Sequence, residues 1–377
     1  MQKLIRVHLR DSRAKNSFVM RIFLSILFTF ALLASSCFGQ WIKQTVNATA
    51  SFRGLSVVNE KVIWASGTGG TVIRTIDAGK TWKVMIVPGA EKLDFRDIEA
   101  FDATTAYILS IGNGESSRIY KTYDGGVTWR LEFQNKDSSA FYDAIACWDS
   151  EHCIAMSDPV AGSFLVMVRR PSDPGVNGFA RKGVSWNHAI YKAPAFEGEA
   201  AFAASGTCLL VTGNYVRRTT DARGAISGSS GLMVSGGKGA RVFKTTDGGV
   251  SWTPSEAEFV HGTPSSGIFS IAMFDSDNGV IVGGNYEKPD EARDNLAFTN
   301  DGGQTWELGT GLSGYRSAVA YVDKKTLIAV GTNGTDLSSD GGKTWKKIGS
   351  EDLNAVAAKG KNAAWAVGSK GMVAKLK

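Results

Sequence analysis

The sequence has few of the residues that build common catalytic centres. Only four histidines occur in 377 residues, and His152, His188 and His261 are far apart. The four cysteines show no spacing typical of a zinc site, and no Gly-x-Ser-x-Gly element marks a serine nucleophile. The Gly-rich string GTGGTV at 67–72 does not open a helix, so it does not indicate a dinucleotide site. We therefore expect no cofactor and no metal.

Long amphipathic helical segments are also lacking. Short apolar runs alternate with Gly, Asn and Asp, which are turn-forming residues. The hydrophobic content of 43% is enough for a globular core, and there are 44 glycines and 10 tryptophans. This pattern favours an all-β fold.

The positive charge is concentrated at the N-terminus. The whole chain carries +6, and residues 1–40 contribute six Lys or Arg against one acidic residue, Asp11, which is +5. The remainder is therefore close to neutral, at +1. A basic surface for nucleic acid is not indicated, and we expect no nucleic-acid partner.

Residues 1–39 have the features of a secretory signal. Basic residues precede the apolar run IFLSILFTFALLASSCFG, which ends in small residues. This predicts export to the periplasm or the cell exterior, with a mature chain that begins near Trp41. Ala34–Cys37 also resembles a lipobox, so a lipoprotein signal with a lipid on Cys37 is the alternative to a plain secretory signal. This lipid anchor is the only contact with a membrane that we expect. Translation from Met20 instead of Met1 would leave the apolar run intact.

Two cysteines flank a short polar segment. Cys147 and Cys153 enclose WDSEH, which reads as a hairpin loop between two strands. Facing positions on such strands are close enough for a disulfide, and an exported protein can keep one. Two unpaired thiols are the alternative. Cys208 lies in an apolar run and is expected in the core.

One octapeptide recurs along the chain. TYDGGVTW at 122–129 has near-copies at 75–82, 245–252, 299–306 and 338–345. Repeats at such intervals indicate a solenoid or a propeller. Asp can accept bonds from the backbone that follows it and Gly can take positive φ, so the element predicts a tight turn between two strands. We expect structural turn roles for Asp77, Asp124, Asp247, Asp301 and Asp340.

The context of the repeats predicts seven blades. Each blade begins with an apolar strand, and these first strands are expected at 53–59, 96–102, 142–149, 199–205, 269–275, 316–322 and 354–360. The last blade lacks a fourth strand, whereas WIKQTV at 41–46 resembles a fourth strand without its blade. We therefore predict an all-β, seven-bladed β-propeller of four-stranded blades over 41–377, with the N-terminal strand closing the C-terminal blade.

Two family resemblances support this architecture. The octapeptide resembles the Asp-box, or BNR, repeat of sialidase-like propellers. The segments 198–213, 265–275 and 311–321 are similar to the photosystem II stability/assembly factor family, and this second resemblance covers 41–377. It implies a non-catalytic role in the assembly or stability of a membrane or envelope complex. Asp boxes occur in several functional classes, so they indicate the fold more than the activity.

The leading residues of the first strands are expected to form a ring at one mouth of the central channel. This ring would consist of Arg53, Arg96, Tyr142, Glu199, Phe269, Arg316 and Asn354. Three guanidinium groups suit a carboxylate, because each can donate two parallel hydrogen bonds. The ring therefore predicts a protein or peptide partner at this mouth.

A sialidase-like glycoside hydrolase, or a carbohydrate-binding propeller, is the alternative. The resemblance then implies Tyr142 and Glu199 as a nucleophile pair, with Asp97 or Asp143 as acid/base. The chain departs from that family, because Phe52-Arg53-Gly54-Leu55 keeps two of the four positions of the Phe/Tyr-Arg-Ile-Pro motif. Sialidases also have six blades. We therefore expect binding rather than catalysis.

Overall fold

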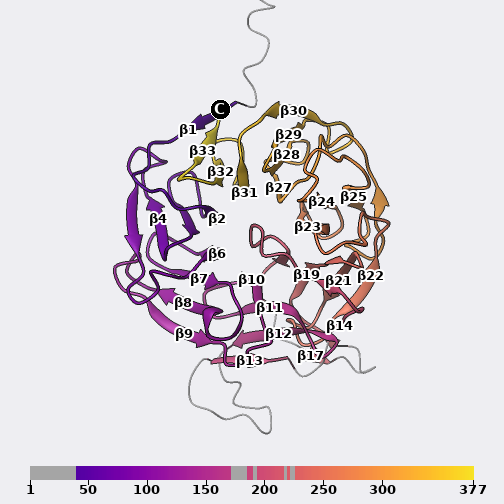
Figure 1. The fold of residues 1–377 in the computed structure, drawn as a ribbon, viewed down its shortest axis with the longest axis horizontal. Coiled ribbons are helices and arrows are strands. Elements are labelled where there is room, and N and C mark those ends of the chain that lie inside the picture. Colours follow the sequence, from indigo (N-terminus) through magenta and orange to yellow (C-terminus); the bar gives the residue numbers. More distant parts are fainter. Residues whose placement is uncertain (1–39, 171–184, 190–192, 216–218, 221–225) are drawn as a thin grey trace, which may run out of the picture. The chain divides into compact units, whose positions relative to one another are not determined.

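The structure is a computed structural model that describes residues 40–170, 185–189, 193–215, 219–220 and 226–377. Residues 1–39, for which a secretory signal is predicted, lie outside the described residues together with Cys37. Trp41–Leu376 forms one compact unit, in which seven sheets are arranged as blades around a central channel (Figure 1). The predicted seven-bladed β-propeller is confirmed.

The first three blades follow the sequence order. Blade one contains β2 (Phe52–Val57), β3 (Ile63–Gly67), β4 (Thr71–Thr75) and β5 (Lys83–Ile86). Blade two contains β6 (Phe95–Ala100), β7 (Ala106–Ser110), β8 (Arg118–Thr122) and β9 (Arg130–Gln134), with a short 3-10 helix at Gly114–Ser116. Blade three contains β10 (Tyr142–Cys147), β11 (Cys153–Val160), β12 (Ser163–Arg170) and β13 (Ser185–His188), and β14 (Ala193–Pro194) pairs with β12.

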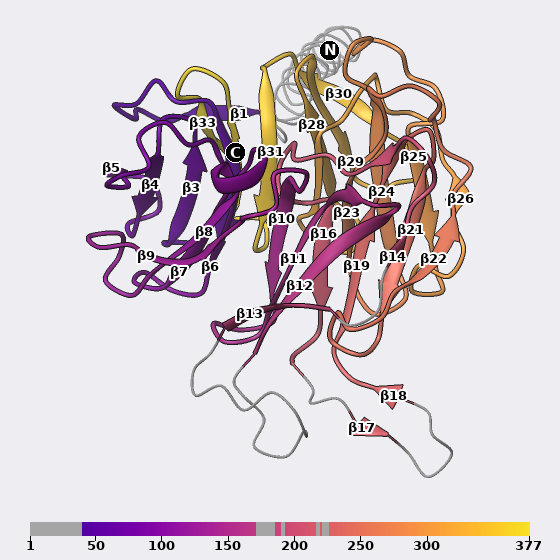
Figure 2. The ribbon, with the colours of Figure 1, turned by 60° about the horizontal axis from the view of Figure 1, so that its bottom comes forward.

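The remaining blades complete the ring, and Figure 2 shows their strands running along the channel axis. Blade four contains β16 (Leu209–Thr212), β19 (Ser230–Val234), β21 (Arg241–Thr245) and β22 (Thr253–Glu256), with a separate hairpin of β17 (Thr219–Thr220) and β18 (Ile226–Ser227). Blade five contains β23 (Ser266–Met273), β24 (Gly279–Asn285), β25 (Leu296–Thr299) and β26 (Glu307–Leu308). Blade six contains β27 (Ala318–Tyr321), β28 (Leu327–Gly331), β29 (Gly334–Ser338) and β30 (Lys346–Gly349).

Blade seven is closed by the N-terminal strand, as predicted. It contains β31 (Leu353–Ala358), β32 (Ala364–Gly368) and β33 (Val373–Leu376), and β1 (Trp41–Lys43) pairs antiparallel with β33. Trp41 faces Leu376 across this pair, and its Nε1 donates to Thr335 Oγ1 of blade six at 2.9 Å. The N-terminal strand is therefore joined to the C-terminal strand of blade seven and, through Trp41, to blade six.

The Asp-box turns join the third and fourth strands of their blades through a repeated hydrogen-bond pattern. In the turn after β8, Asp124 Oδ1 accepts from Thr128 N at 2.9 Å, and Asp124 Oδ2 accepts from Thr128 Oγ1 at 2.6 Å. Thr122 Oγ1 accepts from Gly126 N at 2.9 Å and closes the turn from the other side. The bonds from Thr128 lower the pKa of Asp124 to about 2. The corresponding bonds form at Asp77, Asp247, Asp301 and Asp340.

The fourth blade differs from the prediction, because 199–205 is not a first strand. β15 (Glu199–Ala200) pairs instead with β20 (Gly236–Gly237) at the edge of the blade-five sheet, and β16 is the inner strand of blade four. Residues 201–208, which we call the plug loop, lie at the channel (Figure 1). At Gly206, which has φ 76°, a Cβ would lie 2.2 Å from Asp97 Oδ1, so only glycine permits this approach.

Of the two alternatives for Cys147 and Cys153, the structure has the disulfide. Cys147 faces Cys153 in the register of β10 and β11, and the two sulfurs are bonded across a Cα–Cα distance of 4.0 Å. Cys208 is a free cysteine in the core, as expected. Over the ranges that the structure describes, no helix has the length and apolar character needed to cross a membrane.

Candidate functional site at the channel mouths

The inner strands share a backbone irregularity that selects which residues face the channel. In five of them the register shifts near the start, so that one residue is left unpaired; these residues are Arg53, Arg96, Asp143, Phe269 and Asn354. A bulge of this kind re-aims a side chain and often lies beside a functional site. Four of the five belong to the predicted ring. Tyr142 is paired with Ser157, and its neighbour Asp143 takes the unpaired position.

Two of the predicted arginines converge on the plug loop. Arg53 Nη1 donates to Ala204 O at 3.1 Å, and Arg96 Nη1 donates to Ala203 O at 3.2 Å. Arg96 Nε also donates to Asp94 Oδ2 at 2.8 Å. The plug carbonyls therefore hold both guanidinium groups at the end of the channel where the first strands begin, which we call the upper mouth.

The positive charges of Arg53 and Arg96 are only partly neutralised by acidic side chains nearby. Burial lowers the pKa of Arg53, and the like charge of Arg96 lowers it further, whereas Tyr315, Asp94 and Asp352 act in the opposite direction. Asp94 forms an ion pair with Arg96, but no ion pair is recorded for Arg53 among the residues that the structure describes. Both side chains are half-buried. A bound anion would relieve the repulsion between them and would use their remaining donors.

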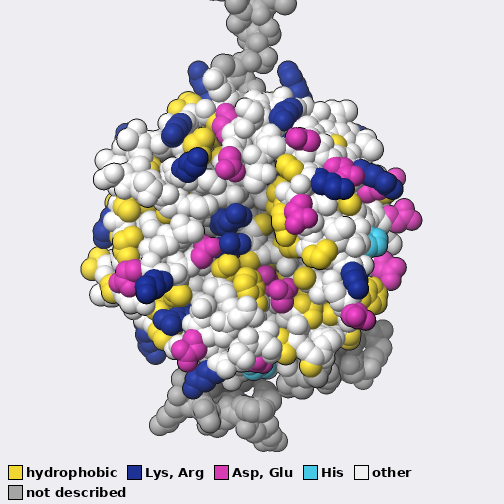
Figure 3. Space-filling view, in the orientation of Figure 1, with side chains coloured by type: hydrophobic (Ala, Val, Ile, Leu, Met, Phe, Trp, Pro, Cys, Tyr) yellow, Lys and Arg dark blue, Asp and Glu magenta, His cyan; other side chains and the backbone are white. Residues whose placement is uncertain are grey.

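Aromatic residues line the same mouth. Phe269 stacks on Phe202 of the plug loop with ring centroids 3.9 Å apart, and Tyr315 packs edge-on against Phe269 at 4.8 Å. Tyr286 contacts this cluster and is 46% exposed. Figure 3 shows basic and hydrophobic side chains beside each other around the central hollow. The upper mouth therefore offers positive charge next to an apolar surface.

Arg316 is not available at this mouth, and its prediction as a partner-binding residue is wrong for this structure. Its side chain is fully buried, and Nη2 forms an ion pair with Asp336 Oδ2 at 2.6 Å. Nη1 donates to Asn333 Oδ1 at 2.7 Å, and Nη2 also donates to Ser313 Oγ at 2.6 Å. Asn354 is buried as well and donates to Phe52 O at 2.9 Å. Both residues fasten blades and loops to each other.

Glu199 and Tyr142 are also placed away from the ring. Glu199 is buried in an ion pair with Arg241, whose Nε donates to Glu199 Oε1 at 2.9 Å. Tyr142 is buried against Phe133, with ring centroids 5.3 Å apart. Glu199 does not head a first strand, so it was assigned to the ring in error. The pair that the sialidase resemblance implied is therefore not presented to a substrate in this structure.

The two aspartates proposed as acid/base residues are buried. Asp97 accepts from Ile98 N and Ile145 N, both at 2.8 Å, and burial raises its pKa to about 7. Burial, followed by the nearby Asp158, raises the pKa of Asp143 well above its usual range. Burial also raises the pKa of Asp158 to about 6, and Asp158 Oδ1 accepts from Ala201 N at 2.8 Å. The hydrogen bonds give Asp97 and Asp158 a structural role, and the one from Ala201 links Asp158 to the plug loop.

Sequence reasoning missed the residues that complete the upper mouth. Phe202 was assigned to a strand, and Asp94, Tyr286 and Tyr315 were not selected. The run of small residues AAFAASGT at 200–207 is a signal that could have been used, because few other sequences fit inside a narrow channel.

Solved structures with this fold include proteins of several functions. The structure titled "YCF48 bound to D1 peptide" is 17% identical, with a TM-score of 0.58 over 89% of this chain and 96% of that chain. YCF48 from Cyanidioschyzon merolae is also 17% identical, with a TM-score of 0.58 over 89% and 98%. A catalytically inactive virginiamycin B lyase from Staphylococcus aureus is 12% identical, with a TM-score of 0.56 over 90% and 98%.

These likenesses define the class of the protein as a seven-bladed β-propeller. No family model and no curated protein matches the chain. At such low identity, the comparison with solved structures concerns the fold alone. The Asp-box and sialidase resemblances therefore stay resemblances, although the hydrogen bonds of the Asp-box turns are present in the structure.

Proposed function

We propose that this protein is an exported, non-catalytic binding module that holds a carboxylate-bearing segment of a protein partner at the upper mouth. The observation that carries the proposal is the placement of Arg53 and Arg96 side by side, each fixed by a plug-loop carbonyl. A carboxylate can accept from the remaining donors of both groups. The neighbouring Tyr286 and Phe202 would contact an apolar side chain of the same segment.

A chain terminus is the segment that this geometry suits best. A C-terminal carboxylate needs donors at one end of an extended peptide and an apolar surface beside it, and the upper mouth supplies both. The YCF48 structure titled as bound to D1 peptide has the same fold, and it supports peptide binding as a use of such a propeller. Export, and assistance in assembling or stabilising an envelope complex, extend this proposal from the N-terminal signal pattern and the family resemblance.

The proposal is tested by co-purification from solubilised envelope. We expect the mature chain to retain a partner that the double variant Arg53→Ala, Arg96→Ala loses, with binding weakened at least about tenfold, because two charge-assisted contacts are removed. The control variant Arg130→Ala, Lys83→Ala removes the same charge from exposed outer strands and should bind normally. Equal partner recovery with all three baits would contradict a site at the upper mouth.

A further inference from the structure

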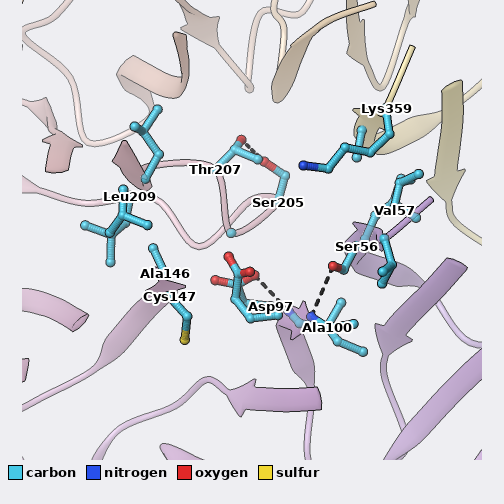
Figure 4. Close-up of a pocket in the computed structure, with 18 of the residues that line it drawn as sticks. Ser56, Val57, Asp97, Ala100, Ala146, Cys147, Ser205, Thr207, Leu209 and Lys359 are labelled. Carbon is cyan, nitrogen blue, oxygen red and sulfur yellow. Dashed lines mark hydrogen bonds between the residues drawn. The ribbon is translucent and has the colours of Figure 1, made fainter. Parts of the chain in front are cut away.

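The opposite end of the channel contains a separate cavity. Its volume is about 450 Å³, and it is lined by the ends of the first strands together with Ser205, Gly206 and Thr207 of the plug loop. The upper-mouth contacts are made by Phe202, Ala203 and Ala204 of the same loop. The plug loop therefore lies between two different chambers. We call the second chamber the lower cavity (Figure 4).

The walls of the lower cavity combine polar and apolar surface. Leu55, Leu210 and Ala357 are apolar lining residues that are only half-buried. The volume lies within the usual range of about 300–1,000 Å³ for a small-molecule site.

Most polar groups on the cavity wall are already used by the protein. Thr207 Oγ1 donates to Ser270 Oγ at 2.7 Å and also bonds Ser205 Oγ at 2.7 Å. Ser56 Oγ accepts from Ala100 N at 3.1 Å. The two oxygens of Asp97 each accept a backbone N–H. These groups hold the wall in place and leave little capacity for a ligand.

Two ionisable groups of opposite type, one acidic and one basic, remain. Glu99 lines the cavity and is half-buried, and no hydrogen bond or ion pair is recorded for its carboxylate among the described residues. Burial and the adjacent Asp97 raise the pKa of Glu99, and Lys359 acts in the opposite direction. Lys359 is at the exposed rim, and its side chain extends into the cavity (Figure 4). The cavity therefore offers a carboxyl group inside and an ammonium group at its rim.

We propose that the lower cavity binds a small zwitterion with an apolar side chain, of which the amino acid leucine is representative. Its ammonium group would bind Glu99, its carboxylate would bind Lys359, and its side chain would contact Leu55, Leu210 and Ala357. An ammonium also favours the ionised form of Glu99, which burial and Asp97 disfavour without a ligand. This site goes beyond the proposed function, because it uses neither arginine of the upper mouth.

The experiment is a titration of the isotopically labelled mature chain with L-leucine, followed through the methyl resonances of Leu55, Leu210 and Ala357. We expect saturable shifts of these resonances. N-acetyl-leucine, which lacks the ammonium, and isoamylamine, which lacks the carboxylate, should each bind at least about tenfold more weakly, since each loses one charged contact.

Variants of Glu99 and Lys359 test which group of leucine each residue binds. Glu99→Gln should weaken leucine binding about tenfold and should leave the already weak binding of N-acetyl-leucine unchanged. Lys359→Met should weaken leucine binding to a similar extent and leave isoamylamine binding unchanged. Lys61→Met is the control, because Lys61 is exposed outside the cavity. If Glu99→Gln fails to fold, the Lys359 variant and the two analogues still decide the question.

Three results would overturn the proposal. These are no saturable methyl shifts with leucine, equal binding of N-acetyl-leucine, or leucine binding that neither variant affects. The double variant Arg53→Ala, Arg96→Ala should bind leucine normally. The two proposals can therefore fail separately. Absence of partner binding at the upper mouth would leave the leucine site intact, and absence of leucine binding would leave the upper mouth intact.

Discussion

At the residue scale, one copy of the Asp box carries a strained backbone. Ala78 has φ 63°, whereas the corresponding positions in the other four turns are Gly125, Gly248, Gly302 and Gly341. A left-handed conformation costs a non-glycine residue roughly 1–2 kcal/mol. The hydrogen bonds from Thr81 to Asp77 hold the turn in spite of this cost.

Replacing Ala78 with glycine is expected to stabilise the protein. Relief of strain exceeds the greater unfolded-state entropy of glycine, so the free energy of unfolding should rise by about 0.5–1 kcal/mol. Denaturant unfolding measures the change. Gly248→Ala is the reverse substitution at an open position, where a Cβ meets nothing within 4 Å, and it should destabilise by about 1 kcal/mol. A destabilised Ala78→Gly variant would show that the turn is not strained.

At the element scale, β1 converts an open series of blades into a closed ring. Without it, β33 would present an unpaired edge. Trp41 contributes most of the packing of β1, since it is only 8% exposed and belongs to the core cluster of blades six and seven. Ile42, the next residue, is 47% exposed.

The two neighbours should therefore respond very differently to truncation. Trp41→Ala is expected to lower the free energy of unfolding by about 3 kcal/mol, because it leaves a cavity and removes the bond to Thr335. Ile42→Ala should change it by less than about 0.5 kcal/mol. Thermal and denaturant unfolding of both variants provide the measurement. Similar effects for the two would mean that β1 does not close the blade in solution.

At the scale of the whole molecule, two groups of carboxyls shift stability with pH in opposite directions. The Asp-box carboxylates Asp77, Asp124 and Asp340 have pKa values lowered to about 2 by hydrogen bonds from Thr or Ser side chains and backbone N–H groups. Their stabilising contribution is complete above about pH 4 and is lost as pH falls toward 2. Asp97 and Asp158 have pKa values raised by burial to about 7 and about 6. They bind more protons in the folded state, so stability falls as pH rises from about 4 to 7.

The free energy of unfolding should therefore be greatest near pH 4–5 and should decrease by a few kcal/mol toward pH 7. Urea unfolding at a series of pH values measures this profile. Asp97→Asn should reduce the slope between pH 5 and 7, whatever its effect on absolute stability. A profile without a slope in that range would indicate that the carboxyl groups of Asp97 and Asp158 are ionised at low pH.

Features that depend on local hydrogen bonding and on strand periodicity could be predicted from the sequence. These are the five Asp-box turns, the closure by residues 41–46 and the seven blades. The spacing of Cys147 and Cys153 allowed a disulfide but left free thiols as an alternative. Arg53 and Arg96 could also be selected, because each precedes a recognisable first strand.

The sequence did not show which of the selected residues meet at a site, because this depends on contacts between distant segments. Two of these residues are buried in ion pairs with residues distant in the sequence. Arg316 pairs with Asp336, and Glu199 pairs with Arg241. The exchange of Tyr142 for Asp143 depends on a bulge, which shifts the register by one residue. The physical reason is that the direction and exposure of a channel residue depend on what fills the channel. That filling is set by the packing of the whole ring and not by the residues beside it in the chain.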